Sequence, residues 1–259
     1  MWSAVLDLLL PSVCPGCHLA AGPDLCPACF ASLPAIISPC AWCGAPRKDP
    51  EADCSACAGR GFTHIAAIAV TWHYAGTVKR LVGDAKAGAR PAAARVLAGL
   101  LPGLAAFYQD DEPPNLVVPI PPAPGRRPGP HLATGLARRL ARRHRLPCRP
   151  GLLVATRFPA EQHALSATDR ERNVADLFRC RESLTGTVVL VDDLVTSGAT
   201  ASAAAKALRA AGALQVLLCC LARTPRRGEL ALIGGAKPTA AIDAADDDSE
   251  SEPTGPSFF

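Results

Sequence analysis

The stretch VVLVDDLVTSGAT (188–200) joins an apolar run to two adjacent aspartates, a short turn of Thr, Ser and Gly, and an alanine-rich segment. The apolar run predicts a buried strand over 186–193, and residues 199–212 predict a helix that ends at Gly212. A further apolar run predicts a strand over 214–222. Strand, helix and strand with unbroken apolar strands are typical of a parallel sheet that is covered on both faces. This stretch therefore predicts an α/β fold.

The same pattern continues toward the N-terminus. Residues 64–74 and 116–122 predict two more strands, and the second of these must stop at its prolines. Residues 76–101 predict two helices with a break near Gly88. Residues 132–145 predict a helix with leucines on one side and arginines on the other. Strands and helices thus alternate through the middle of the chain.

Composition divides the 259 residues into three regions. Residues 1–60 carry cysteine pairs separated by Pro and Gly, and residues 61–242 hold the alternating strands and helices. Residues 243–259 contain six acids and no Lys or Arg, which predicts a disordered acidic tail. The rest of the chain carries 27 Lys and Arg against 17 acids, so its formal charge is +10 where the whole chain has +4.

The chain has no run of 18 apolar residues, so we expect no insertion into a membrane. Its first residues, MWSAVLDLLLPSVC, include an apolar stretch but neither a positively charged start nor a small-residue cleavage site. This pattern is typical of a short helix packed on the protein and not of a signal peptide. We therefore expect a cytoplasmic location.

Eight of the 12 cysteines form four CxxC pairs in the first 60 residues. Thiols stay reduced in the cytoplasm, so paired cysteines there are more often metal ligands than disulfides. Two pairs supply the tetrahedral sulfur set that Zn²⁺ favours. We therefore predict two structural, all-Cys zinc ions, held by Cys14, Cys17, Cys26, Cys29, Cys40, Cys43, Cys54 and Cys57.

Pairing in sequence order, 14/17/26/29 and 40/43/54/57, is the simplest arrangement of these ligands, and interleaved pairing is the alternative. A redox dithiol is disfavoured because such a motif is usually single and opens a helix in a βαβ unit. The remaining cysteines lack the spacing and are expected to be ordinary buried or half-buried thiols: Cys148, Cys180, Cys219 and Cys220.

The turn after the two aspartates lies at the carboxyl end of a predicted parallel strand, where α/β proteins bind ligands. Backbone N–H groups and hydroxyls of this turn can surround a phosphate, and the start of the next helix adds partial positive charge. Gly198 lets the backbone approach the ligand closely. The two acids would repel a phosphate unless they bound another part of the ligand, such as the hydroxyls of a ribose, or stabilised positive charge on a sugar carbon.

Other nucleotide-binding motifs are missing from the sequence. It contains no GxxxxGK[ST], and no GxGxxG follows a strand, so neither a P-loop nor a dinucleotide fold is supported. The simpler alternative is a pair of aspartates that caps a loop without binding any ligand, since helix N-termini commonly attract acids.

The stretch 188–200 resembles the signature of type I phosphoribosyltransferases for 5-phosphoribosyl diphosphate (PRPP). The resemblance extends to the ComF family of competence-related proteins, which includes GntX-like members, through CPGC, CPAC, CAWCG, VKRLVGDAKAGAR, LVVPIPPAPGRR and TRFPAEQHALSATDRERNVADLF. It covers nearly everything except the acidic tail. It implies a type I phosphoribosyltransferase-like parallel sheet with flanking helices, preceded by a small Cys-rich zinc-ribbon module.

This resemblance implies specific roles for residues of the chain. Asp192 and Asp193 would bind the ribose hydroxyls and act in catalysis. The 5-phosphate would be held by Thr196, Ser197, Gly198, Ala199 and Thr200. The pyrophosphate would lie at Pro119, Ile120 and Pro121, with positive charge from Lys86, Arg126, Arg127 and Arg157. Mg²⁺ would arrive with PRPP. The run Arg127-Pro128-Gly129-Pro130 departs from the family pattern.

The resemblance further implies a Mg²⁺-dependent glycosyltransferase for pentosyl transfer, with PRPP as its substrate and a role in DNA uptake during natural transformation. Single-stranded DNA and other DNA-uptake proteins are the partners that it implies. The alternative is a non-catalytic module that senses PRPP or binds single-stranded DNA. The basic body, the zinc ribbons and the altered segment after the pyrophosphate loop favour that alternative. The arginines of 132–145 could follow a phosphate backbone, but a solvated helix face is the favoured interpretation, and the aromatic content of 5% offers little surface for base stacking.

Overall fold

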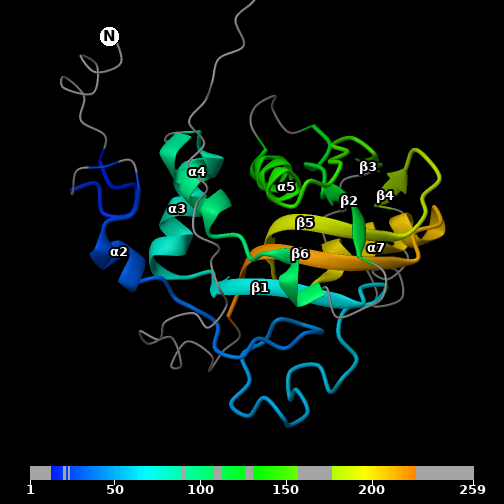
Figure 1. The fold of residues 1–259 in the computed structure, drawn as a ribbon, viewed down its shortest axis with the longest axis horizontal. Helices are drawn as coiled ribbons and strands as arrows, with labels where there is room; N and C mark the ends of the chain where they lie inside the picture. Colours follow the sequence, from blue (N-terminus) through cyan, green and yellow to red (C-terminus); the bar gives the residue numbers. More distant parts are fainter. Residues whose placement is uncertain are drawn as a thin grey trace, which may run out of the picture.

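A parallel sheet of four strands in the order β1-β6-β5-β2 forms the centre of the protein (Figure 1). The computed structural model describes residues 13–19, 22, 24–88, 91–107, 113–125, 131–156 and 177–225. The strands are β1 (Ala67–His73), β2 (Pro114–Pro119), β5 (Thr187–Val195) and β6 (Gln215–Arg223). β5 and β6 are apolar along most of their length because both faces of the sheet are covered.

Helices cover the two faces of the sheet. One face carries α3 (Gly76–Lys86), α4 (Pro91–Gly99), the 3₁₀ turn η1 (Leu104–Phe107) and α5 (Leu132–Arg143). The other face carries α7 (Ala199–Ala210). Side chains of β5 alternate between the two cores, with Val189 and Val191 in the first and Val188 and Leu190 in the second.

The cysteine-rich segment contains a short helix, α2 (Pro27–Ala31), and then runs along the outer edge of β1. Ile36 N–H donates to the Thr71 carbonyl at 2.8 Å, and Ile68 N–H donates to the Ala41 carbonyl at 2.7 Å. Ala35 forms an antiparallel bridge with Trp72. These contacts satisfy backbone groups that an edge strand would otherwise expose, and they fix the cysteine-rich segment to the sheet.

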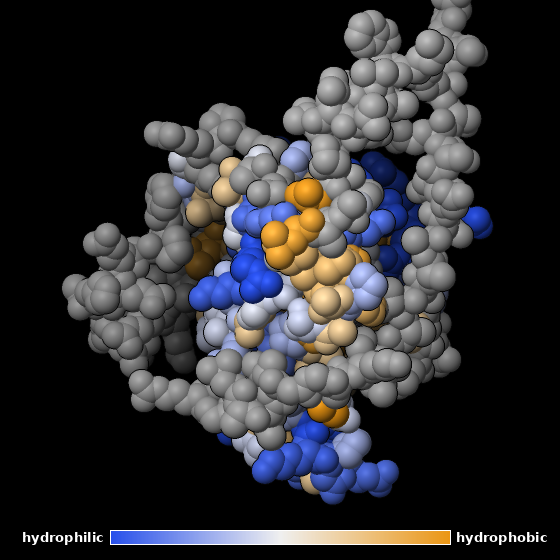
Figure 2. All heavy atoms as spheres, turned by 90° about the vertical axis from the view of Figure 1, so that its left-hand side faces the viewer, coloured by the Kyte–Doolittle hydropathy of each residue, from blue (hydrophilic) through white to orange (hydrophobic). Residues whose placement is uncertain are grey.

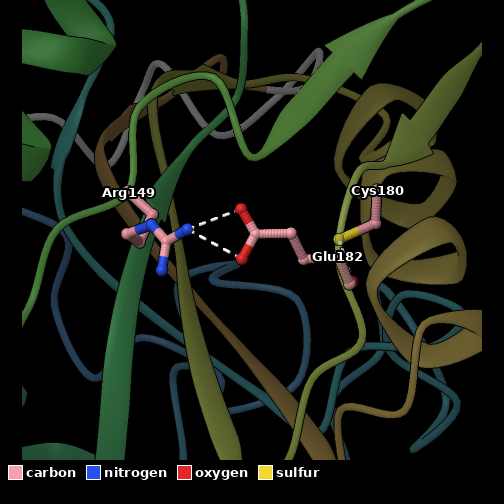
Figure 3. A network of polar contacts seen from close by, with 3 residues as sticks. All are labelled: Arg149, Cys180 and Glu182. Atoms are coloured by element: carbon pink, nitrogen blue, oxygen red, sulfur yellow. Dashed lines mark hydrogen bonds and ion pairs between the residues drawn. The ribbon is translucent and has the colours of Figure 1, made fainter.

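A second, antiparallel sheet consists of β3 (Leu153–Ala155) and β4 (Phe178–Cys180), which packs near α7. An ion pair links the segments just outside these strands (Figure 3). Arg149 Nη2 donates to both carboxylate oxygens of Glu182 at 2.6 and 2.8 Å, and the Cys180 thiol donates to the Glu182 carbonyl at 3.2 Å. Residues 157–176, between β3 and β4, lie outside the described part of the chain.

The surface on the side of α2 and α3 combines polar and apolar side chains. Figure 2 shows an apolar area near the centre of this face with hydrophilic residues beside it. Leu19 and Phe30, which belong to the first part of the cysteine-rich segment, are among the exposed large apolar side chains of the described residues. None of the described helices is both long enough and apolar enough to span a bilayer.

The predicted α/β fold is confirmed, and the strands and helices lie within a few residues of their predicted bounds. The break between the two helices of 76–101 falls between α3 and α4, and Gly212 follows α7 with a φ of 108°. β5 ends at Val195, two residues later than predicted, because its pairing with β6 continues to Val195 opposite Arg223. The sheet β3–β4 was not predicted, and most of the helix expected at the start of the chain lies outside the described residues.

We expect the ion pair in Figure 3 to contribute little to stability, because both of its side chains are about half exposed. Glu182→Gln should lower the free energy of unfolding by at most about 1 kcal/mol. Leu208→Ala, which empties a fully buried position on α7, should lower it by about 2–5 kcal/mol. Urea denaturation monitored by circular dichroism measures both values, and a larger loss for Glu182→Gln than for Leu208→Ala would contradict this assignment.

Candidate functional site

β5 carries two acidic side chains to the carboxyl end of the sheet. Asp193 follows the alternation of Val189 and Val191, so it belongs to the face that α3–α5 cover. There its carboxylate forms an ion pair with Lys86, the last residue of α3. Asp193 N–H donates to Asp192 Oδ1 at 2.8 Å. The two neighbouring acids are therefore in different surroundings, and Lys86 pairs with Asp193 and not with Asp192.

The charge on this pair of acids is only partly compensated. Burial raises the pKa of the Asp192 carboxyl well above its ordinary value, and the neighbouring charge of Asp193 raises this pKa further. Lys86 acts in the opposite direction but does not cancel the shift. A ligand that brings hydroxyl donors or a cation to Asp192 would stabilise its ionised form.

The turn after β5 presents backbone donors to solvent. α7 begins at Ala199, and Gly198 at its N-cap has a left-handed φ of 80°. The N-cap glycine offers no side-chain acceptor, and the Ser197 hydroxyl accepts from Ala199 N–H at 3.4 Å, a long hydrogen bond. The first N–H groups of α7 can therefore turn to an anion. The side chains of the turn are exposed on both sides of the buried glycine: Thr196, Ser197, Ala199 and Thr200. This arrangement has the features of a phosphate-binding turn.

The ring of Phe62 packs against Gly198 in the turn before α7. A Cβ atom at Gly198 would lie 2.3 Å from Phe62 Cδ1 and Cε1, so the ring occupies the space that a side chain would need. Glycine is required here by both its φ and this contact. The sequence contains no signal for the contact, because Phe62 and Gly198 lie far apart in the chain.

The end of β2 reaches the same edge of the sheet. Ile120 N–H donates to the Val191 carbonyl at 2.9 Å, which places Ile120 directly beside the strand that carries Asp192. Pro119 and Pro121 have no N–H. The predicted pyrophosphate loop therefore offers no free backbone donor within 119–121, and cationic side chains or a ligand-borne metal must hold any anion there.

The structure brings together most of the predicted site. Asp192, Asp193, Lys86, the 119–121 segment and the 196–200 turn all belong to the carboxyl edge of the parallel sheet. Three further predicted residues lie outside the described part of the chain: Arg126, Arg127 and Arg157.

The eight paired cysteines form two four-sulfur clusters, 14/17/26/29 and 40/43/54/57, each with its Sγ atoms within 4.8 Å of one another. A tetrahedral set with Zn–S bonds of about 2.3 Å places sulfur atoms about 3.8 Å apart. Measured Sγ–Sγ distances are 3.9 Å for Cys17–Cys26, 3.9 Å for Cys40–Cys57 and 3.7 Å for Cys43–Cys54. The clusters therefore fit Zn²⁺, and the sequential pairing is confirmed over the interleaved alternative.

A groove of about 290 Å³ lies among α3, α4 and α5, and Ala85 on α3 is one of its lining residues. Its floor consists of alanine and leucine side chains, and arginines border it. Arg95, Arg138 and Arg142 make no ion pair within the described residues. The groove thus combines an apolar floor with three arginines that have no acidic partner in the described part of the chain.

Comparisons with known proteins match both parts of the chain. A family model described as a double zinc ribbon domain matches residues 5–59, and one described as a phosphoribosyl transferase domain matches residues 127–237. The DNA utilization protein YhgH of Salmonella typhi is 31% identical over 228 residues, which cover 84% of this chain and 99% of that protein. YhgH of Escherichia coli K12 is 42% identical over 73 residues, 28% of this chain and 32% of that protein.

Solved structures also show partial similarity. A structure of the allosteric regulatory enzyme of purine biosynthesis is 22% identical to this chain, with a TM-score of 0.30. The matched region covers 48% of this chain and 24% of the enzyme chain. The structure of TT1426 from Thermus thermophilus is 15% identical to this chain, with a TM-score of 0.30. The matched region covers 59% of this chain and 88% of the TT1426 chain.

Asp192 is expected to lower the stability of the ligand-free protein near neutral pH. Its pKa is raised in the folded state, so between the ordinary pKa of about 4 and the raised one the folded state binds more protons than the unfolded state. The free energy of unfolding must therefore fall as pH rises through this window. Asp192→Asn should abolish that fall and raise the free energy of unfolding at pH 8 by on the order of 1 kcal/mol.

Lys86→Gln is the opposing variant, because Lys86 lowers the pKa of Asp192. In Lys86→Gln, the free energy of unfolding should fall more steeply with rising pH than it does in the wild type. Urea denaturation of the three proteins from about pH 4.5 to 8.5 measures both effects. Equal pH profiles for the wild type and Asp192→Asn would show that the Asp192 carboxylate carries no such penalty.

Proposed function

The chain belongs to the ComF/GntX-like family of the DNA utilization protein YhgH, and from this premise we propose that it binds Mg·PRPP at the carboxyl end of β5. The observation that carries the proposal is the exposed, uncapped start of α7 directly after two acids. A phosphate suits the turn, and vicinal hydroxyls suit the acids. One ligand with both groups at opposite ends of a ribose matches this order of residues.

Each part of PRPP has a partner in this proposal. The 5-phosphate accepts from the N–H groups of 196–200, and the ribose hydroxyls donate to Asp192 and Asp193. The pyrophosphate lies beside Ile120, where Lys86 supplies positive charge. Arg126, Arg127 and Arg157 complete the proposed set of cations. Mg²⁺ comes with the ligand and neutralises pyrophosphate oxygens, as it does in other phosphate sites.

We propose pentosyl transfer as the reaction class. The bond between the anomeric carbon and the pyrophosphate oxygen breaks, and the leaving pyrophosphate takes the electron pair. An acceptor nucleophile forms the new bond to that carbon. Positive charge develops on the sugar between these events, and the carboxylates of Asp192 and Asp193 would stabilise it. The buried position of Asp193 strengthens this electrostatic effect.

The direct test is calorimetric titration with Mg·PRPP. The wild type should bind, and Asp192→Asn/Asp193→Asn should weaken binding on the order of 100-fold, because two charge-assisted hydrogen-bond acceptors are lost. Glu182→Gln is the matched control, since it removes an exposed carboxylate away from the site and should bind like the wild type. Absence of binding by the wild type, or equal binding by the double variant, would refute the proposal. Pyrophosphate release across a panel of acceptors then measures turnover.

A second candidate function is binding of single-stranded DNA at the groove among α3, α4 and α5. The arginines at its border favour it, and so does the name of the Salmonella relatives, DNA utilization protein. One lining residue of the groove, Ala85, precedes Lys86 in sequence. Apart from the imidazole of His131, no aromatic side chain lines the groove among the described residues, so phosphate contacts must carry most of the affinity.

Salt dependence tests this second function. Arg138→Ala/Arg142→Ala should weaken binding of a labelled single strand and reduce the slope of log K against log salt by about 1.4, or about 0.7 per lost phosphate contact. Arg179→Ala on β4 is the control and should leave the slope unchanged. DNA binding that is absent, or that does not respond to salt, would refute this function.

The remaining proposals concern organisation and location. We propose a zinc-ribbon module over 1–60, a phosphoribosyltransferase-like domain over 61–242 and an acidic tail over 243–259. We also propose a cytoplasmic location and contacts with other DNA-uptake proteins. The name of the Salmonella relatives, DNA utilization protein, supports the second of these.

A further inference from the structure

Phe62 lies between the second cysteine cluster and the turn before α7, and we propose that it couples zinc binding at Cys40, Cys43, Cys54 and Cys57 to the shape of that turn. Phe62 would act as a positioning residue, since it contacts the backbone of the turn and not the ligand. The consequence for phosphate affinity rests on the function proposed above, whereas the coupling itself does not.

The contact with the turn is close and specific. Besides the two ring atoms at 2.3 Å, Phe62 Cγ would lie 2.8 Å from a Cβ at Gly198. The half-buried ring therefore fills the space beside Gly198 where a Cβ would lie, while Ser197 and Ala199 on either side are exposed. The start of α7 has no side-chain cap, so this apolar support replaces one of the usual means of ordering a helix N-terminus.

Phe62 also contacts the second cysteine cluster. Phe62 packs against the small core formed by Cys40, Cys43, Ala45 and Cys54. The N–H of the preceding residue, Gly61, donates to the sulfur of Cys57. A Cβ at Gly61 would lie 2.9 Å from the carbonyl oxygen of Trp42, inside the CAWC knuckle.

These contacts form one path from the sulfur atoms to the turn. Zinc would fix the thiolates of the cluster in a single tetrahedral arrangement. A fixed Cys57 holds Gly61 through its N–H, and the knuckle around Trp42 holds it from the other side. Phe62 is then confined against Gly198, so the N–H groups of 196–200 stay aligned. Without the metal, like-charged or protonated thiols would separate, and the ring would lose its support.

The first cluster offers a matched comparison because its polar contacts run elsewhere. Arg80 Nε donates to the Gly16 carbonyl at 3.4 Å, and His18 Nε2 lies 3.3 Å from Asp84 Oδ2. Both contacts lead to α3 and not to the turn. The two zinc ions of the ribbon should therefore differ in what they stabilise.

Amide hydrogen exchange of the peptide 202–205 tests the coupling without any ligand, because these are the first backbone-bonded N–H groups of α7 and Ser202 N–H donates to the Gly198 carbonyl at 2.8 Å. In full-length protein with two bound zinc ions, Phe62→Ala should accelerate exchange in this peptide about tenfold, the size typical of such couplings. Phe62→Met, which refills most of the volume with a flexible apolar side chain, should restore exchange to near the wild-type rate. Both variants should keep two zinc ions per chain by elemental analysis, which separates loss of the ring from loss of the metal.

Two cysteine variants test the metal itself. Cys57→Ser and Cys26→Ser should each leave one zinc ion per chain. Only Cys57→Ser should accelerate exchange in 202–205. Equal acceleration by both variants would mean that losing either zinc destabilises the whole protein, which would overturn the specific coupling. Unchanged exchange in Phe62→Ala would overturn it as well, even if Cys57→Ser fails to fold.

Ligand binding supplies a separate readout. Titration with ribose 5-phosphate should show an affinity about tenfold lower for Phe62→Ala than for the wild type, with recovery in Phe62→Met. If the wild type binds neither ribose 5-phosphate nor PRPP, the proposed function fails while the exchange measurements still decide the coupling. If the wild type binds and Phe62→Ala binds equally well with unchanged exchange, only the coupling fails.

Discussion

β5 lies between β2 and β6, and its parallel pairing with both strands places the other parts of the site. In the pairing of β5 with β6, Asp192 lies opposite Cys220, and the pairing continues beyond both acids to Val195. On its other side, β5 accepts a hydrogen bond from Ile120. Because all four strands are parallel, their carboxyl ends meet at one edge, and α3 delivers Lys86 to the same edge. The acids, the turn and the end of β2 are neighbours for this reason alone.

That placement has a cost in electrostatic free energy. Two adjacent carboxylates lie at a partly buried sheet edge, and among the described residues Lys86 forms an ion pair with Asp193 alone. Burial and the neighbouring charge of Asp193 therefore raise the pKa of Asp192. A protein selected for stability alone would gain by replacing one acid with an amide. Retention of both is understandable if a ligand supplies the missing donors and positive charge, as PRPP with Mg²⁺ would. The pair of acids is therefore electrostatically unfavourable when the site is empty, which is consistent with the hydroxyl-rich, phosphorylated sugar proposed as its ligand.

Much of this arrangement could be predicted from the sequence, because it depends on local patterns. Apolar runs mark β5 and β6, the CxxC spacing marks both metal clusters, and the turn 196–200 follows its strand directly. Contacts between distant segments could not be predicted in the same way. Phe62 against Gly198 has no sequence signal, and the strands of β3 and β4 are too short for any periodicity. Lys86 was predicted as a cation of the site, but its pairing with Asp193 becomes visible only when α3 is placed on the sheet.

The central claim is that the turn after β5 binds the 5-phosphate of PRPP. Amide NMR of the isotope-labelled protein titrated with Mg·PRPP tests it most directly. We predict the largest shift changes at the N–H groups of Gly198, Ala199 and Thr200, with smaller changes at Asp192 and Asp193. Shift changes confined to the arginine-bordered groove, with the 196–200 amides unaffected, would contradict it.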